Sequence, residues 1–198
     1  MRRLPLLVLP AVLAVALVLG FFVWRTGDAL PGFVTASGTA AVGGPFTLVD
    51  QDGRRRASAS FAGRYMLIYF GYSYCPDVCP TTLSLMGDAL SKVGPKAGRI
   101  VPIFITIDPE RDTPRQLKTY MRAFGPQFVG LTGDLAAIRT VAAAYRVYFR
   151  KQPLAQGGYG MDHSNVIYLM GPDGKFLAYW DDTAIGPDAL AAALREKT

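Results

Sequence analysis

Two long apolar runs constrain the fold of this chain more than any other feature. Residues 65–69 (YMLIY) and 100–107 (IVPIFITI) carry few polar side chains, which is typical of strands that are buried on both faces of a sheet. Between them, apolar residues recur at helical spacing from about Pro80 to Val93, and Gly94, followed by a proline, ends this predicted helix. A buried strand, a helix and a second buried strand predict parallel pairing in an α/β fold.

The rest of the chain continues the alternation of strands and helices. Thr113 and Thr132 are predicted N-caps of two further helices, and Pro187 opens a last one. The segment Gln152–Met161 is rich in glycine and is predicted to be irregular. Short strands are predicted at Phe46–Val49, Arg55–Ser58, Phe128–Leu131, Val147–Arg150, Asn165–Met170 and Phe176–Trp180, the first two forming a hairpin around residues 50–53.

The N-terminal segment is a membrane-anchor candidate. Residues 4–24 contain no charged side chain, and Arg2, Arg3 and Arg25 bracket them. This length is sufficient to cross a bilayer core of about 30 Å at about 1.5 Å per residue. The alternative is a cleaved signal peptide, whose apolar core is normally only about 7–15 residues long. An uncleaved anchor is favoured, and its leading arginines place the rest of the chain on the extracytoplasmic, periplasmic side.

We therefore expect four parts along the chain. These are a cytoplasmic stub at 1–3, a transmembrane anchor at 4–24, a flexible linker rich in Gly, Ala, Ser and Thr at 25–44, and one domain at 45–198. The net charge of +6 is spread along the chain, and no basic helix alternates with stacking aromatic residues. Nucleic acid is therefore not an expected partner.

Cys75 and Cys79 are the only cysteines, and they lie in the stretch GYSYCPDVCP at 71–80. Because Pro80 fits only in the first turn of a helix, Cys75 is predicted in a loop and Cys79 near the helix N-terminus. Such a pair at the end of the first central strand is the position that thioredoxin-like folds use, so we expect that fold. Amide groups and the helix dipole stabilise a thiolate there, and a thiolate is both a nucleophile and a metal ligand. Asp77, between the cysteines, is interpreted as a helix cap rather than a ligand.

His163 is the only histidine, and it comes just before a predicted strand. In a thioredoxin-like sheet, the loop that enters this strand packs beside the cysteine loop, so the two thiols and the imidazole are expected to converge. Such a soft, low-coordinate set suits Cu(I), and it accepts Cu(II) with a further oxygen ligand. Structural zinc is disfavoured because it requires four protein ligands.

Three segments of the chain together resemble the Sco/SenC family of membrane-anchored copper chaperones. They are GYSYCPDVCP at 71–80, ITIDPERDTP at 105–114, and GYGMDHS at 158–164 followed by LMGPDGKF. The resemblance covers about 45–198 and the N-terminal anchor. It implies a thioredoxin-like fold that binds copper through Cys75, Cys79 and His163. It also implies a role in building the binuclear copper centre of cytochrome c oxidase, with the subunit that carries this centre as partner.

Two functions are compatible with these residues. The first is a metallochaperone, which needs His163 as well as the cysteines and takes copper from a donor chaperone. The second is a thiol–disulfide oxidoreductase, in which Cys75 and Cys79 form the catalytic redox pair that reduces the copper-ligating cysteines of a partner. Whether the protein is an enzyme therefore stays open at this stage, because the two functions can coexist. A peroxidase and a purely structural disulfide are less favoured, since no activating group stands beside Cys75 and so short a loop gains little from a disulfide.

The charged residues of the second segment have two interpretations of equal weight. Asp108, Arg111 and Asp112 form either a surface that guides partner docking or tunes the metal, or a structural brace for the loop before Thr113. Tyr72 and Tyr74 are expected to shield the site or to offer a contact surface.

Overall fold

The structure is a computed structural model, and it describes residues 42–198. The predicted anchor at 4–24 and nearly all of the predicted linker lie outside these residues. Within 42–198, no helix combines the length and the apolar character needed to cross a bilayer.

A seven-stranded mixed sheet forms the centre of the domain, in the order β2-β1-β5-β4-β3-β8-β9. Three neighbouring strands, β5, β4 and β3, are parallel, and β1, β8 and β9 add antiparallel pairs at the two sides. The two apolar runs form β3 and β4, as predicted. The strands are β1 (Thr47–Asp50), β2 (Arg55–Ala57), β3 (Tyr65–Gly71), β4 (Ile100–Thr106), β5 (Val129–Thr132), β8 (Val166–Met170) and β9 (Phe176–Asp181).

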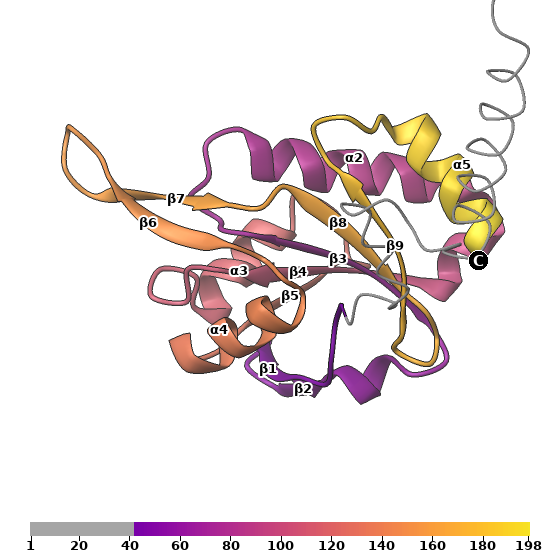
Figure 1. The fold of residues 1–198 in the computed structure, drawn as a ribbon, viewed down its shortest axis with the longest axis horizontal. Helices are drawn as coiled ribbons and strands as arrows, with labels where there is room; N and C mark the ends of the chain where they lie inside the picture. The colour runs from indigo at the N-terminus through magenta and orange to yellow at the C-terminus, as the bar shows by residue number, and fades with distance from the viewer. Residues whose placement is uncertain (1–41) are drawn as a thin grey trace, which may run out of the picture. The chain divides into compact units, whose positions relative to one another are not determined.

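Helices cover both faces of the sheet. They are α2 (Val78–Val93), α3 (Pro114–Met121), α4 (Leu135–Ala144) and α5 (Pro187–Lys197), with short 3₁₀ turns η1 (Ser58–Phe61) and η2 (Gly94–Arg99). Figure 1 shows α2 and α5 side by side along one side of the sheet and α4 on the other. The expected α/β, thioredoxin-like architecture with an added N-terminal hairpin is confirmed.

Alternation along β3 explains why both faces need helices. Tyr69 packs against Phe104 and reaches toward Cys79 of α2, whereas the next residue, Phe70, packs against Tyr145 just after α4. All of these side chains are fully or almost fully buried. Since successive side chains of a strand point to opposite faces, a strand of this composition is stable only between two helical layers.

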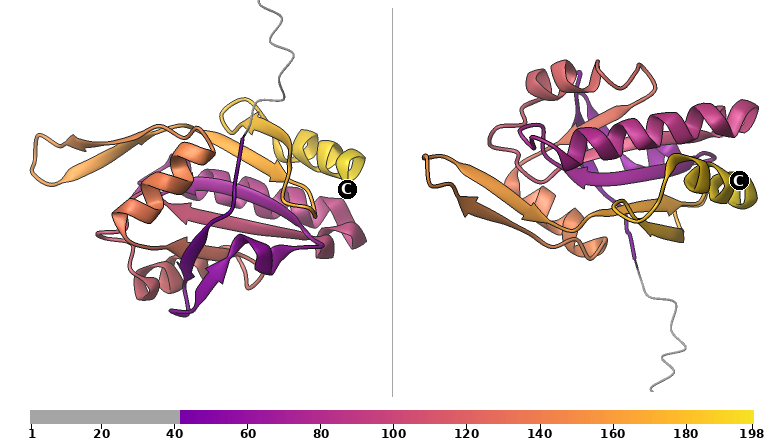
Figure 2. Two further views of the ribbon diagram at one scale, coloured as in Figure 1. Left: turned by 60° about the horizontal axis from the view of Figure 1, so that its bottom comes forward. Right: turned by 90° about the horizontal axis from the view of Figure 1, so that it is seen from above.

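A second, two-stranded sheet corrects the sequence prediction. The segment Gln152–Met161, predicted to be irregular, belongs to the antiparallel hairpin of β6 (Phe149–Pro153) and β7 (Tyr159–His163), with Phe149 opposite His163. Its glycines are concentrated at the tip, where Gly157 and Gly158 take φ values of 89° and 78°. The glycine content therefore marks a turn. Figures 1 and 2 show the hairpin projecting beyond the seven-stranded sheet.

The predicted helix starts were only partly right. Thr113 caps α3 by accepting a hydrogen bond from the Gln116 N–H at 3.3 Å. The predicted cap Thr132 is instead the last residue of β5, and Asp134 caps α4 by accepting from the Ala137 N–H at 2.7 Å. The strand ends one residue later than predicted, and the cap lies two residues later, at the start of the helix.

Candidate metal centre

The two cysteines occupy different environments at the start of α2. Cys75 lies in the loop after β3 and is half-buried, whereas Cys79 is the second residue of the helix and is fully buried. The Cys79 N–H donates a hydrogen bond to Cys75 Sγ at 3.4 Å. Asp77 precedes the helix, as predicted, but its side chain makes no capping hydrogen bond. Both cysteines are free thiols.

His163, at the end of β7, lies beside the buried cysteine. Its Nε2 is 3.6 Å from Cys79 Sγ, and its Nδ1 is 3.0 Å from the carbonyl oxygen of Ser164. Because a carbonyl only accepts, we assign the ring proton to Nδ1. The lone pair of Nε2 then points toward the sulfur. A histidine held by a carbonyl at one nitrogen is the usual arrangement of a metal ligand.

Close packing of β3 on α2 brings Cys79 to this position. A Cβ atom on Gly71 would lie 2.8 Å from Cys79 Sγ and 2.9 Å from the Phe104 ring. Only glycine allows the helix N-terminus to approach the end of the strand so closely. The glycine that opens the cysteine stretch is therefore part of the site.

Hydrogen bonding makes the two thiols unequal. A hydrogen bond from the Cys79 side chain lowers the pKa of Cys75 far below its usual range. Burial opposes this shift, and hydrogen bonds from the backbone N–H groups of Cys79 and Asp77 add to it. The same contact with Cys75, together with burial, raises the pKa of Cys79. Cys75, the more exposed sulfur, is therefore the more acidic of the two thiols.

Aromatic rings line the buried side of the candidate metal centre. The rings of Tyr69 and Tyr72 meet the His163 imidazole edge-on, with centroids 6.1 Å apart in each case. The Tyr69 hydroxyl lies 4.0 Å from Cys79 Sγ, and burial raises the Tyr69 pKa, so the phenol stays protonated. Tyr72 is buried against the site, whereas Tyr74 is 54 % exposed next to Cys75. Of the two tyrosines singled out from the sequence, Tyr72 shields the centre and Tyr74 is available at the surface.

Two aspartates of the segment ITIDPERDTP at 105–114 brace the site. Asp112 is fully buried and accepts hydrogen bonds from Ser73, in the cysteine loop, and from Thr106. Asp108 pairs with Arg111 at 2.5 Å and accepts from the Tyr159 hydroxyl at 3.0 Å. Their hydrogen-bond partners are these residues rather than the cysteines or His163.

Tyr159 and Ser73 belong to this arrangement, and the sequence interpretation missed both. Tyr159 shares a face of β7 with Met161 and His163, because residues two apart in a strand point the same way. That alternation was present in the sequence, but the glycine content of the segment obscured it. Ser73 has no comparable signal, since its partner is distant in the chain.

The chemistry of the donor set is that of a soft metal site. A thiolate, a thiol that can lose its proton and an imidazole nitrogen suit Cu(I), and also Cu(II) with additional oxygen ligands. The residues present therefore fit a copper ion.

Several known proteins are similar to this chain in sequence and in structure. The chain is 41% identical to the mitochondrial SCO1 homolog 1 of Arabidopsis thaliana over 146 residues, which is 73% of this chain and 44% of that protein. It spans about half the length of the curated relatives it matches. Bradyrhizobium japonicum ScoI, solved with copper bound, is 44% identical and superimposes with a TM-score of 0.73 over 80% of this chain and 100% of its own.

Two further structures extend the comparison. Copper-bound ScoI of Arabidopsis thaliana is 38% identical, with a TM-score of 0.76 over 79% of this chain and 98% of its own. BsSco, described as a member of the Sco family of cytochrome c oxidase assembly proteins with a disulfide switch, is 26% identical, with a TM-score of 0.64 over 79% of this chain and 93% of its own. These matches extend over nearly the whole length of the solved chains, so in those relatives this part folds on its own.

The SCO1/SenC family model matches from residue 34 to residue 198, a range that includes all three candidate ligands. With this match and relatives at about 40% identity, the chain belongs to the SCO1/SenC family.

Proposed function

We propose that this protein is a copper chaperone that binds one copper ion through Cys75, Cys79 and His163 and delivers it to a partner. Two contacts carry the proposal: His163 Nε2 lies 3.6 Å from Cys79 Sγ, and the Cys79 N–H donates to Cys75 Sγ at 3.4 Å. The copper-bound relatives support copper as the cargo.

The unequal thiols suit both loading and release. Cys75 is already a thiolate and is half-buried, so it is the first sulfur that an incoming ion meets. Cys79 gives up its proton when the ion binds, which makes binding weaker in acid. A partner can then take the ion by ligand exchange that starts at the exposed sulfur.

The expected partner is the subunit of cytochrome c oxidase that carries the binuclear copper centre. The relationship to BsSco, which belongs to a family of cytochrome c oxidase assembly proteins, supports this assignment. We further propose the parts expected from the sequence: a stub at 1–3, a membrane anchor at 4–24, a linker at 25–44 and the copper-binding domain at 45–198 on the periplasmic side. Such an anchor would hold the domain near a membrane-bound oxidase.

A second candidate function is reduction of the partner's cysteines. The thiolate of Cys75 is placed to attack a partner disulfide, and Cys79 then resolves the mixed disulfide. The partner gains two thiols while Cys75 and Cys79 form a disulfide, so the electrons balance. This reaction requires both cysteines but not His163.

An anaerobic titration separates these functions. The compact unit Ala40–Thr198 would be fully reduced and titrated with Cu(I), alongside Cys75→Ser, Cys79→Ser and His163→Ala. The chaperone proposal expects one tightly bound copper, lost in the cysteine variants and weakened in His163→Ala. If all three variants load copper like the wild type, the ligand set is wrong. If only the cysteines matter, in copper binding and in reduction of a disulfide-containing target, the reductase function is preferred.

A further inference from the structure

The strand that carries His163 is not fastened to the central sheet by strand pairing. Within residues 42–198, β6 and β7 pair only with each other, as a sheet separate from the seven-stranded one. The two cysteines, in contrast, stand at the junction of β3 and α2. Contacts other than a strand ladder must therefore hold the imidazole against the sulfurs.

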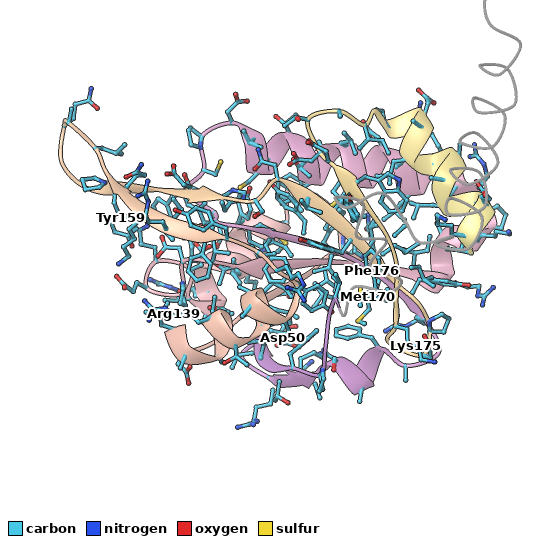
Figure 3. All side chains as sticks on the ribbon, viewed as in Figure 1. Asp50, Arg139, Tyr159, Met170, Lys175 and Phe176 are labelled. Carbon is cyan, nitrogen blue, oxygen red and sulfur yellow. The ribbon has the colours of Figure 1, made fainter. Side chains whose placement is uncertain are left out.

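Arg111 makes such a contact with the first residue of β7. Its guanidinium carbon lies 3.8 Å from the centroid of the Tyr159 ring, and its Nη1 donates a hydrogen bond to the Tyr159 carbonyl at 3.0 Å. The Arg111 side chain thus contacts both the ring and the backbone carbonyl of Tyr159. Figure 3 labels Tyr159 on the projecting hairpin, and its pairing with Pro153 places it next to the turn.

Asp108 accepts hydrogen bonds from both Arg111 and Tyr159 and so holds this pair in place. Its carboxylate is 1% exposed, and it accepts from Arg111 Nε at 2.5 Å and from the Tyr159 hydroxyl at 3.0 Å. A buried carboxylate shared by a guanidinium and a phenol leaves both groups little freedom. Asp108 lies two residues after the end of β4, so the contact starts from the rigid centre of the domain.

The other side of Arg111 faces the cysteine loop. Its guanidinium carbon lies 4.9 Å from the Tyr74 ring centroid and 5.7 Å from that of Tyr72. The Nη2 atom is buried without a hydrogen-bond partner, and the neighbouring π faces explain how its charge is accommodated. Arg111 therefore lies between the loop that carries Cys75 and the strand that carries His163.

Alternation along β7 connects this contact to the metal centre. Tyr159 and His163 share one face of the strand, about 13 Å apart at about 3.3 Å per residue. The intervening Asp162 points to the exposed face, where it meets Arg150 at 3.3 Å. Fastening Tyr159 therefore sets the tilt of the strand whose far end presents the imidazole.

We propose that Arg111 is a positioning residue that holds His163 against the cysteine pair by fastening Tyr159 to the cysteine loop. This inference rests on the proposed three-ligand copper site. It predicts that loss of Arg111 releases the imidazole while leaving both sulfurs in place. The bound copper would then be held by sulfur without the histidine nitrogen.

The test uses Arg111→Gln and Tyr159→Leu in the compact unit Ala40–Thr198, which corresponds to the part that folds on its own in the solved relatives. Lys151→Gln is the matched control, because Lys151 Nζ also lies over the Tyr159 ring, at 4.5 Å, but is exposed and pairs with Glu110. Tyr159→Leu keeps the Asp108–Arg111 pair intact. It therefore still tests whether Tyr159 positions His163 if Arg111→Gln fails to fold.

The readouts are Cu(I) affinity and the nitrogen hyperfine signal of bound Cu(II) in electron paramagnetic resonance. We expect both test variants to lose the nitrogen signal and about 10- to 100-fold of affinity, as when an outer-shell partner of a metal ligand is removed. Lys151→Gln should match the wild type. In a His163→Ala background, Arg111→Gln should cause no further loss, because the residue through which it acts is already gone.

Two different results would contradict the positioning role and the three-ligand copper site separately. If the test variants fold and keep the nitrogen signal and affinity, or if Arg111→Gln weakens binding equally without His163, the positioning role is wrong and the copper site stands. If His163→Ala alone changes neither readout, the three-ligand site itself fails.

Discussion

Asp112, which is fully buried, accepts hydrogen bonds from both the backbone N–H and the hydroxyl of Ser73, at 2.9 and 2.5 Å. The same carboxylate accepts from the Thr106 hydroxyl at 2.6 Å at the end of β4. One side chain thus fixes the cysteine loop to the central sheet. The loop has few other backbone partners, so its conformation depends on this carboxylate.

Replacing Asp112 tests this dependence through the contrast between alanine and asparagine. Burial raises the pKa of Asp112, with the Ser73 and Thr106 hydrogen bonds opposing, so its charge lowers stability at neutral pH. Asp112→Asn retains an acceptor without the charge and should lower the free energy of unfolding by less than about 1 kcal/mol. Asp112→Ala leaves buried donors unpaired and should cost about 3 kcal/mol. Urea unfolding of both variants would measure this, and equal losses would contradict the proposed brace.

Gly71→Ala should disturb the metal centre without touching a candidate ligand. The added methyl group would stand 2.8 Å from Cys79 Sγ and 2.9 Å from the Phe104 ring, so the start of α2 must move. We expect a loss of about 1–3 kcal/mol, as for other overpacked cores, together with weaker Cu(I) binding. Unfolding and titration would measure the two effects. Gly98→Ala is the control, since its added atom meets nothing within 4 Å, and a similar loss there would refute the packing explanation.

The reactivity of Cys75 should depend on the thiol of Cys79. In the reduced protein, alkylation of Cys75 by iodoacetamide should vary little between about pH 5 and pH 8, because a thiolate is already present. In Cys79→Ala the side-chain hydrogen bond is lost but the backbone N–H still donates to Cys75 Sγ, so the rate should rise with pH more steeply than in the wild type. Cys79→Ser keeps a donor and should lie between the two. Mass spectrometry of the alkylated peptide gives the rates, and identical profiles for all three proteins would assign the low pKa to another cause.

Local patterns in the sequence were sufficient to predict the architecture. The apolar runs that became β3 and β4 need no knowledge of distant contacts, because a strand buried on both faces carries its signature in its own side chains. Thr113 and Pro187 marked helix starts for equally local reasons. The prediction that Thr132 caps a helix was wrong because Thr132 and Asp134 can both act as caps. Only the length of β5 decides between them.

The site was predictable only as far as it repeats a known topology. The approach of His163 to Cys79 follows from the order of strands, and it was expected. The roles of Ser73 and Tyr159 depend on buried carboxylates that arrive from another loop, and no spacing within their own segments reports such partners. The equal weighting of Asp108 and Asp112 between docking and bracing had the same cause, and their buried hydrogen bonds favour bracing.

The acid sensitivity of the domain should depend in part on Asp50, the last residue of β1, where the hairpin turn begins (Figure 3). Burial raises the pKa of Asp50, but hydrogen bonds from the Arg54 and Asp52 N–H groups and the Arg56 guanidinium outweigh it, so the folded-state pKa lies below the unfolded value. A lowered carboxyl pKa adds stability that is complete above the unfolded value of about 3.9 and is lost as the pH falls through the folded value.

Asp50→Asn should therefore lower the free energy of unfolding by about 1–3 kcal/mol at neutral pH. The difference from the wild type should shrink as the pH falls below about 4, because the stabilising charge of Asp50 is lost as the pH falls through its folded-state pKa. Asp52→Asn is a suitable control, because Asp52 and its partner Lys118 are 39% and 52% exposed, and an exposed pair contributes less than about 1 kcal/mol. Urea unfolding at a series of pH values would decide. A constant difference between Asp50→Asn and the wild type across that series would show that packing of the turn, and not the charge of Asp50, stabilises this end of the sheet.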